Sequence, residues 1–176
     1  MSLPHAILTS LAERPGSGSE LASRFDRSIG YFWQATHQQI YRELARLEAR
    51  GWVKGDLVQG ARGRKRRYDI LASGLAELRR WLDEPVEPPP IRDELLVRVR
   101  AEGVTGSSGL DRRLEVLLRH HRRKLETYRA IEQRDFASEP TGQRDRLHRL
   151  VLKAGMDFER QRIGFCEQAL IVIRET

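Results

Sequence analysis

The sequence predicts a mainly α-helical protein with a small β-hairpin, in which an N-terminal winged helix-turn-helix precedes a C-terminal α-helical domain. Three observations support this fold class: a capped amphipathic helical pattern at residues 36–50, two strand patterns around a run of cations directly after it, and two long helical patterns in the second half of the chain. A helix followed by a basic β-hairpin is typical of winged helix-turn-helix domains, most of which bind duplex DNA.

Two short helices are predicted before the capped helix. Residues 4–13 place Ile7, Leu8 and Leu11 on one face, and a second helix begins at about Ser19. The intervening residues 14–18 are rich in turn formers and predict a connecting turn. An aromatic turn is predicted at residues 28–33, and a packing role in the core is favoured for its rings.

The capped helix has clear start and stop signals. Thr36 and Gln39 stand three residues apart, the spacing of a capping box, and Gly51 ends the helix. A single buried stripe is predicted at positions i, i+4 and i+7, formed by Ile40, Leu44 and Leu47.

The β-hairpin follows at once. Residues 52–59 and 67–70 read as strands, and the turn at residues 60–67 holds five cations in eight residues with no acid among them. A fourth helix is predicted at residues 72–82.

A proline-rich segment divides the chain. Four prolines within residues 85–90 are incompatible with a continuing helix and favour an extended linker. We therefore predict a winged helix-turn-helix domain at residues 1–84, a linker at residues 85–91 and a helical dimerisation domain at residues 92–176.

The second half is predicted to be helical at residues 92–101, 110–134 and 142–173, with a flexible loop at residues 103–109. The first long helix is predicted to turn inward Leu114, Leu117, Leu118, Leu125, Tyr128 and Ile131. The last helix is predicted to turn inward Leu147, Val151, Ala154, Phe158, Phe165, Ala169 and Val172. These long apolar stripes need a partner surface.

Charge and composition limit the classes of partner. The formal net charge of +7 favours polyanions, with nucleic acid ahead of an anionic membrane surface. A single cysteine, Cys166, favours a reducing compartment. Because the N-terminus does not resemble a signal peptide and the longest apolar run, residues 169–173, is far short of about 20 residues, we expect a cytoplasmic protein that does not enter a membrane.

The predicted DNA contacts fall into two groups. On the recognition helix, glutamine amides can pair with adenine, arginine can reach guanine or phosphate, and hydroxyls can donate to phosphates. These positions are Thr36, His37, Gln38, Gln39, Tyr41 and Arg42. In the wing, the cations predicted to neutralise phosphates or to enter the minor groove are Arg62, Arg64, Lys65 and Arg66. Four phosphate contacts would give a salt slope of about −3.6.

Catalysis is not predicted. Cys166 lies within a helical pattern beside Phe165 and is interpreted as a buried structural residue. The adjacent His120 and His121 point about 100° apart on a helix, so one site could use both only awkwardly. No glycine-rich phosphate-binding loop, metal-ligand spacing or nucleophile elbow is present, and no cofactor is expected.

Several segments together resemble the PadR family of bacterial transcriptional regulators, and more narrowly its virulence-activator-like branch. The matching segments are residues 30–44, Leu47-Glu48, Gly51, Gly63-Arg64, Tyr68 and residues 92–96. One departure is Leu71, where many members of the family have Thr. With Leu71 in that place, Ser73 is the predicted cap of the following helix.

The resemblance implies a homodimeric repressor that binds a pseudopalindromic operator through two winged helices. Its dimer contacts are expected at Leu114, Leu117, Leu125, Val151, Phe158 and Phe165.

Two alternatives remain open. The first is a regulator that responds to a planar aromatic effector, for which the candidate pocket residues are Trp33, Trp81, Phe158 and Phe165, although an aromatic core is the favoured interpretation of these side chains. The second is a winged-helix protein–protein adaptor that does not bind DNA, against which the uncompensated cationic turn argues.

Overall fold

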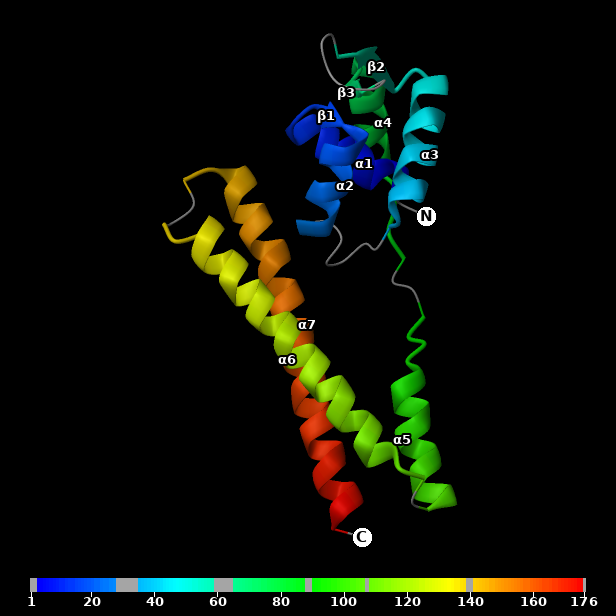
Figure 1. The fold of residues 1–176 in the computed structure, drawn as a ribbon, viewed down its shortest axis with the longest axis vertical. Coiled ribbons are helices and arrows are strands. Elements are labelled where there is room, and N and C mark those ends of the chain that lie inside the picture. The colour runs from blue at the N-terminus through cyan, green and yellow to red at the C-terminus, as the bar shows by residue number, and fades with distance from the viewer. Residues whose placement is uncertain are drawn as a thin grey trace. The chain divides into compact units, whose positions relative to one another are not determined.

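The computed structural model describes residues 3–27, 35–58, 65–87, 90–106, 108–138 and 141–175. The chain divides into two compact units, Met1–Pro88 and Pro89–Thr176 (Figure 1). The predicted aromatic turn at residues 28–33, with Trp33, lies outside the described residues, as do Arg62 and Arg64 of the predicted wing. The predicted fold class is confirmed, since the chain is mostly helical with one small antiparallel sheet.

The described residues of the first unit form the helices α1 (Leu3–Glu13), α2 (Gly18–Arg27), α3 (His37–Ala49) and α4 (Ala72–Leu82). Each turns an apolar face toward a common core. The buried side chains of this core are Ile7, Leu8, Leu11, Leu21, Ala22, Phe25, Ile40, Leu44, Leu47, Val53 and Tyr68. The predicted stripe of α3 is therefore confirmed.

Both ends of α3 follow from local sequence. Thr36 is the N-cap: its Oγ1 accepts a hydrogen bond from Gln39 N at 3.2 Å, and Gln39 Oε1 accepts from Thr36 N at 2.8 Å. At the other end Gly51 has a φ of 67°, a left-handed conformation that residues with a Cβ rarely adopt. The capping box and the glycine stop were both predicted correctly.

The sheet has three antiparallel strands in the order β1-β3-β2. β2 (Val53–Leu57) and β3 (Arg66–Ile70) form the predicted hairpin. β2 is shorter than the predicted strand at residues 52–59, and β3 begins one residue before the predicted strand at residues 67–70. β1 (Gly16–Ser17) was not predicted, because two residues are too few to show strand periodicity and lie within a segment of turn formers.

The predicted cap of α4 is wrong. α4 begins at Ala72, one residue after the N-cap Leu71, whose side chain makes no capping hydrogen bond. Ser73 lies in the first turn, and its hydroxyl donates to the carbonyl of Gly51 instead. The reason is that β3 passes directly into α4: Leu71, whose N–H still donates to Trp52 O at 2.9 Å, already accepts the first helical hydrogen bond from Leu75 N, so the helix begins before Ser73.

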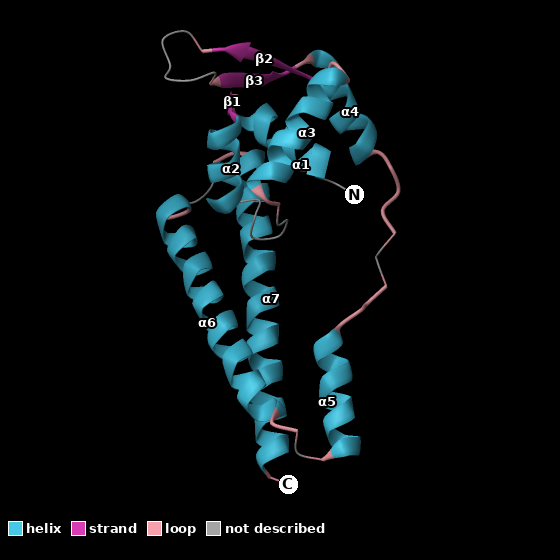
Figure 2. Cartoon of the chain, turned by 45° about the vertical axis from the view of Figure 1, so that its right-hand side comes forward, coloured by secondary structure: helices cyan, strands magenta, loops and turns pink. Residues whose placement is uncertain are grey.

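The second unit contains α5 (Glu94–Thr105), α6 (Leu110–Asp135) and α7 (Gln143–Arg174). Figure 2 shows α6 and α7 side by side along their length. The core of this unit is formed by Leu110, Leu114, Leu118, Cys166, Ala169 and Leu170. α5 is longer than predicted and includes Gly103, which was expected in a loop; Asp93 caps it by accepting a hydrogen bond from Leu95 N at 3.0 Å.

The face that α7 buries differs from the prediction. Met156, Glu159, Cys166, Ala169 and Leu170 are buried in the protomer. Several predicted inward residues lie on the surface instead, namely Leu147, Val151, Ala154, Phe158 (48% exposed) and Val172 (64% exposed). α7 carries more apolar side chains than one neighbouring helix can cover, so periodicity alone selected the wrong stripe. Among the described residues, none of the helices has the length and apolarity to cross a membrane.

Candidate nucleic-acid interface

The polar side chains predicted to read DNA lie together at the N-terminal end of α3. Thr36, His37, Gln38, Gln39 and Arg42 are all exposed, as Tyr41 is in part. This end of the helix also presents backbone N–H groups, which favour a phosphate oxygen or another anion. The arrangement is therefore a polar, exposed helix start on a rigid, well-packed core.

The residues of this surface differ in how free they are to bind a ligand. Thr36 and Gln39 are engaged with each other in the capping box. The ring of Tyr41 packs against the backbone of Gly18, at the start of α2. By contrast, Gln38 and Arg42 make no side-chain hydrogen bond or ion pair with any other described residue, so their donors are available for base edges or phosphates.

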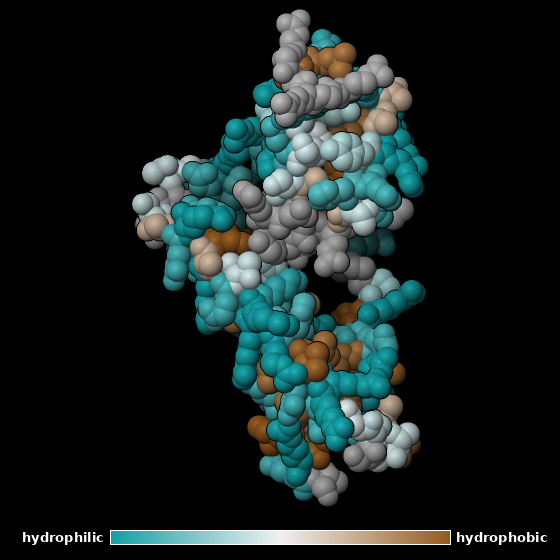
Figure 3. Space-filling model, viewed as in Figure 1, coloured by the Kyte–Doolittle hydropathy of each residue, from teal (hydrophilic) through white to brown (hydrophobic). Residues whose placement is uncertain are grey.

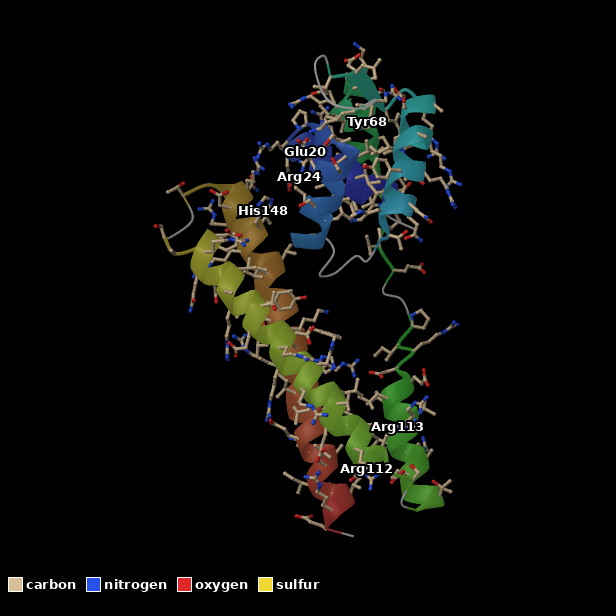
Figure 4. All side chains as sticks on the ribbon, viewed as in Figure 1. Glu20, Arg24, Tyr68, Arg112, Arg113 and His148 are labelled. Carbon is tan, nitrogen blue, oxygen red and sulfur yellow. The ribbon has the colours of Figure 1, made fainter. Side chains whose placement is uncertain are left out.

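In the described part of the wing, Lys65 and Arg66 are paired with acids, whereas the sequence predicted a cationic turn without compensating acids. Lys65 Nζ lies 3.3 Å from Glu20 Oε1, and Arg66 makes a bidentate pair with Glu48, at 2.8 and 2.6 Å. Figure 4 labels Glu20 on α2, near the sheet that carries Tyr68. The backbone N–H of Ser17 and the ammonium of Lys65 hold the pKa of the Glu20 carboxyl at about 2.

Glu20 and Glu48 were not assigned a role from the sequence. The Leu47-Glu48 pair of the family resemblance is the one sequence signal that touches either residue. Each acid is distant from its cation in the sequence, by 45 residues for Glu20 and Lys65 and by 18 for Glu48 and Arg66. Hydrophobic periodicity carries no information about such pairs.

Two of the predicted effector residues, Trp81 and Phe158, have a ring or cation partner within their own unit. Trp81 stacks on His5, with ring centroids 4.4 Å apart and planes 7° from parallel. In the second unit, Arg162 lies over the ring of Phe158, 5.2 Å from its centroid, and Phe165 is partly buried.

The predicted dimer residues fall into two sets. Leu114 and Leu125 are buried within the protomer, and Leu117 and Phe165 are partly buried there. Val151 and Phe158 are half-exposed, and Figure 3 shows further apolar side chains on the visible surface of the second unit.

The groups considered for catalysis occupy structural positions. Cys166 is fully buried, and burial raises the pKa of its thiol, which makes the reactive thiolate less accessible. His121 Nδ1 lies 2.5 Å from Glu159 Oε2, while His120 presents its ring at 79° to that of His121. In the part of the chain that the structure describes, no three His, Cys, Asp or Glu side chains are grouped to hold a metal ion.

A small antiparallel sheet behind a capped helix with a polar, exposed start is the arrangement of a winged helix-turn-helix domain. Residues 7–80 match the model of the transcriptional regulator PadR-like family, and residues 91–174 match the virulence activator alpha C-terminal family. The chain belongs to the PadR family of transcriptional regulators.

Relatives match along nearly the whole chain. The probable transcriptional regulator Rv1176c of Mycobacterium tuberculosis is 42% identical, with 99% of each chain covered. The negative transcriptional regulator PadR of Bacillus subtilis is 29% identical, with 97% of each covered.

Solved structures with the same fold include a DNA complex. The virulence activator AphA of Vibrio cholerae has a TM-score of 0.83 at 31% identity, with 99% of each chain covered. Bacillus subtilis PadR in complex with operator DNA has a TM-score of 0.85 at 28% identity, with 98% of each covered. The same protein in complex with p-coumaric acid has a TM-score of 0.77 at 28% identity, covering 99% of this chain and 96% of that one.

Proposed function

We propose that this chain is a sequence-specific DNA-binding repressor that acts as a homodimer on a pseudopalindromic operator. The observation that carries the proposal is the capped N-terminus of α3, where Gln38 and Arg42 are exposed and unengaged by other described residues. The fold it shares with PadR bound to operator DNA supports DNA as the partner. The name of the Bacillus subtilis relative, a negative regulator, supports repression.

In this proposal α3 enters the major groove. Gln38 reads adenine through its amide, Gln39 offers a base only its amide nitrogen because its oxygen is part of the capping box, and Arg42 reaches guanine or a phosphate. Thr36, His37 and Tyr41 contact the backbone at the edge of the groove. The cationic turn of the wing, with Arg62 and Arg64, lies along the adjacent phosphates and contributes affinity without much sequence preference.

The second unit supplies the two-fold partner surface. The half-exposed Val151 and Phe158 are apolar side chains that the protomer does not cover. Residues 1–84 bind DNA, residues 85–91 link the domains and residues 92–176 dimerise. A two-fold dimer presents two recognition helices about one helical turn apart, which requires a symmetric operator. Such a regulator acts where the chromosome lies, in the cytoplasm.

Selection of binding sites from a random duplex pool, near physiological salt, tests the proposal. The expected result is enrichment of a two-fold symmetric sequence whose half-sites are centred about 10 base pairs apart or a multiple of that spacing. Gln38→Ala should then change the preference at one base pair per half-site by about 1–3 kcal/mol. Retention of weak, salt-sensitive binding without any enriched sequence would favour the protein–protein adaptor instead.

A second candidate function is response to a planar aromatic effector. It is favoured by the p-coumaric acid complex of the similar Bacillus subtilis protein. Titration of the tryptophan fluorescence with a phenolic acid should give saturable quenching, together with weaker operator binding. Unchanged fluorescence and unchanged operator affinity would exclude this class of effector.

A further inference from the structure

At one residue on the edge of the wing, Gly55, side chains rather than a neighbouring strand satisfy the outward-pointing backbone groups. β2 is an edge strand, and the hydrogen bonds from Leu71 N to Trp52 O and from Val58 N to Lys65 O, both 2.9 Å, fix the alternation of its ladder with β3. Gly55 therefore stands in a non-hydrogen-bonded pair with Tyr68, and its N–H and C=O point away from β3.

Both of these outward-pointing groups are bound by side chains. Gly55 N donates to Glu48 Oε1 at 3.0 Å, and the carbonyl of Gly55 accepts from Arg66 Nη2 at 2.5 Å. Glu48 and Arg66 also bind each other through both carboxylate oxygens, at 2.8 and 2.6 Å. One cluster thus joins the last turn of α3, the edge of β2 and the start of β3.

The strand geometry explains why Arg66 reaches this cluster. Alternate residues of a strand share a face, so Arg66 lies on the same face of β3 as the buried Tyr68, with its guanidinium carbon 5.5 Å from the centroid of that ring. Gly55 leaves the necessary space: a Cβ there would lie 2.9 Å from Arg66 Nη2 and 2.7 Å from Tyr68 Cε1.

Charge and burial agree with a structural pair. The side chains of Arg66 and Glu48 are 39% and 30% exposed, so the pair is partly shielded from water. Hydrogen bonds from Arg66 lower the pKa of Glu48, which keeps this carboxylate ionised at neutral pH. A bidentate guanidinium–carboxylate pair fixes orientation as well as distance.

We propose that Glu48, Gly55 and Arg66 form a wing anchor, which holds the β-hairpin in a set position on the recognition helix, and that Arg66 is a positioning residue rather than a phosphate contact. The inference rests on the proposed DNA-binding function and refines the role of the wing. Lys65, tied to Glu20, holds the opposite flank of the hairpin to α2. In this proposal the wing contacts the DNA phosphates through its other cations.

The two roles of Arg66 predict opposite signs for one substitution. If Arg66 bound phosphate, Glu48→Gln would release it and remove a nearby negative charge, so operator affinity would rise. If Arg66 anchors the wing, Glu48→Gln lowers operator affinity by about tenfold, the size expected for a lost charge-assisted interaction.

The test uses the full-length protein and its selected operator duplex, titrated over a series of salt concentrations. Glu48→Gln, Arg66→Gln and the double variant should each weaken binding by a similar factor, because either change breaks the same cluster. The salt slope should stay within about 0.3 of wild type, whereas loss of a phosphate contact would reduce it by about 0.9. Asp56→Asn is the matched control: it removes an acid of the same hairpin whose ion pair among the described residues is with Lys54, and affinity should hold or rise.

Arg66→Lys keeps the charge and loses the bidentate geometry, which separates the two roles without a change of net charge. The wing anchor predicts weaker operator binding for this variant, and a phosphate contact predicts nearly unchanged binding. A rise in affinity for Glu48→Gln, or wild-type affinity for Arg66→Lys, would overturn the proposal.

Amide hydrogen exchange of Gly55 in the free protein gives a readout that does not require DNA. Exchange should accelerate in Glu48→Gln and Arg66→Gln and stay unchanged in Asp56→Asn. Unchanged exchange in Glu48→Gln would refute the wing anchor whatever the DNA data show. If the wild-type chain bound no duplex while Gly55 lost protection in the variants, the proposed DNA-binding function and the role of Arg66 in it would both be contradicted. The contact of the hairpin with α3 through Glu48, Gly55 and Arg66 would still be supported.

Discussion

The two units of this chain treat their apolar side chains differently. In the first unit, α1 to α4 and the sheet enclose a core whose main side chains, from Ile7 to Val53, are almost completely buried. In the second unit, α6 and α7 bury one stripe between them and leave apolar residues such as Phe158 and Val172 on the surface.

This difference in packing fits separate roles for the two units. A unit that closes its own core can present polar side chains outward, and the exposed residues on α3 are of the kind that read DNA. A helical unit with uncovered apolar side chains gains stability when a partner covers them. In our proposal the partner is a second copy of the chain.

The largest effect is expected in the core of the first unit. Leu44→Ala removes a fully buried side chain of α3 and should lower the free energy of unfolding by about 2–5 kcal/mol. Urea denaturation followed by circular dichroism measures this change. Leu57→Ala, at an exposed position of the same unit, is the control and should stay within about 0.5 kcal/mol. Equal losses in both variants would contradict the closed core.

The second prediction concerns the surface of the second unit. Phe158→Ala should weaken homodimerisation by at least about tenfold, because a half-exposed aromatic side chain that a partner covers contributes strongly to an interface. Sedimentation velocity over a dilution series measures the dimer dissociation constant. Leu82→Ala, which shortens an exposed apolar side chain of the first unit, should leave that constant unchanged. A dimer indifferent to Phe158→Ala would place the interface elsewhere.

The third prediction tests how locally α3 is determined. Thr36→Ala removes the hydroxyl that accepts from Gln39 N and should lower the free energy of unfolding by about 1 kcal/mol. Thermal unfolding measures the loss. Thr36→Ser keeps the hydroxyl and should remain close to wild type, so equal destabilisation by Ala and Ser would argue against the capping box.

The smallest effect is a pH dependence within the first unit. Arg80 and His5 hold the pKa of Glu77 at about 2, well below its ordinary value of 4.5. Because the folded-state pKa is depressed, this stabilisation is complete above pH 4.5 and is lost as the pH falls toward 2. After allowance for solvent screening the loss should be below about 1 kcal/mol.

Glu77→Gln should therefore flatten the acid limb of stability between these pH values. Urea denaturation at a series of pH values measures the slope, with Glu87→Gln as a control at an exposed position in the linker. If the acid limb of Glu77→Gln were as steep as that of wild type, the contacts of Glu77 with Arg80 and His5 would not be the source of this pH dependence.

Local features of this fold could be predicted from the sequence, and long-range ones could not. The capping box of Thr36, the stripe of Ile40, Leu44 and Leu47 and the bounds of α4 all depend on residues within a few positions of one another. By contrast, Glu48 contacts Arg66 only because the hairpin folds back onto α3. The sequence therefore predicts Arg66 to contact phosphate or the minor groove, because nothing local to it indicates a pair with Glu48.

The face of α7 shows a second limit. Periodicity identified the helix correctly, but this helix carries apolar residues on more than one face, and the neighbouring α6 covers only one of them. Which stripe meets α6 is decided by three-dimensional packing, including the contact of the buried Glu159 with His121 and Lys124. No single-helix pattern contains that information.

The most direct test of the whole account is the mass of the complex between the full-length chain and its selected duplex, measured by sedimentation equilibrium. We predict two chains of 20.4 kDa on each symmetric duplex, and much weaker binding to a duplex that carries only one half-site. One chain for each symmetric duplex, or equal affinity for the single half-site, would contradict a dimeric regulator in which the first unit reads DNA and the second provides the partner surface.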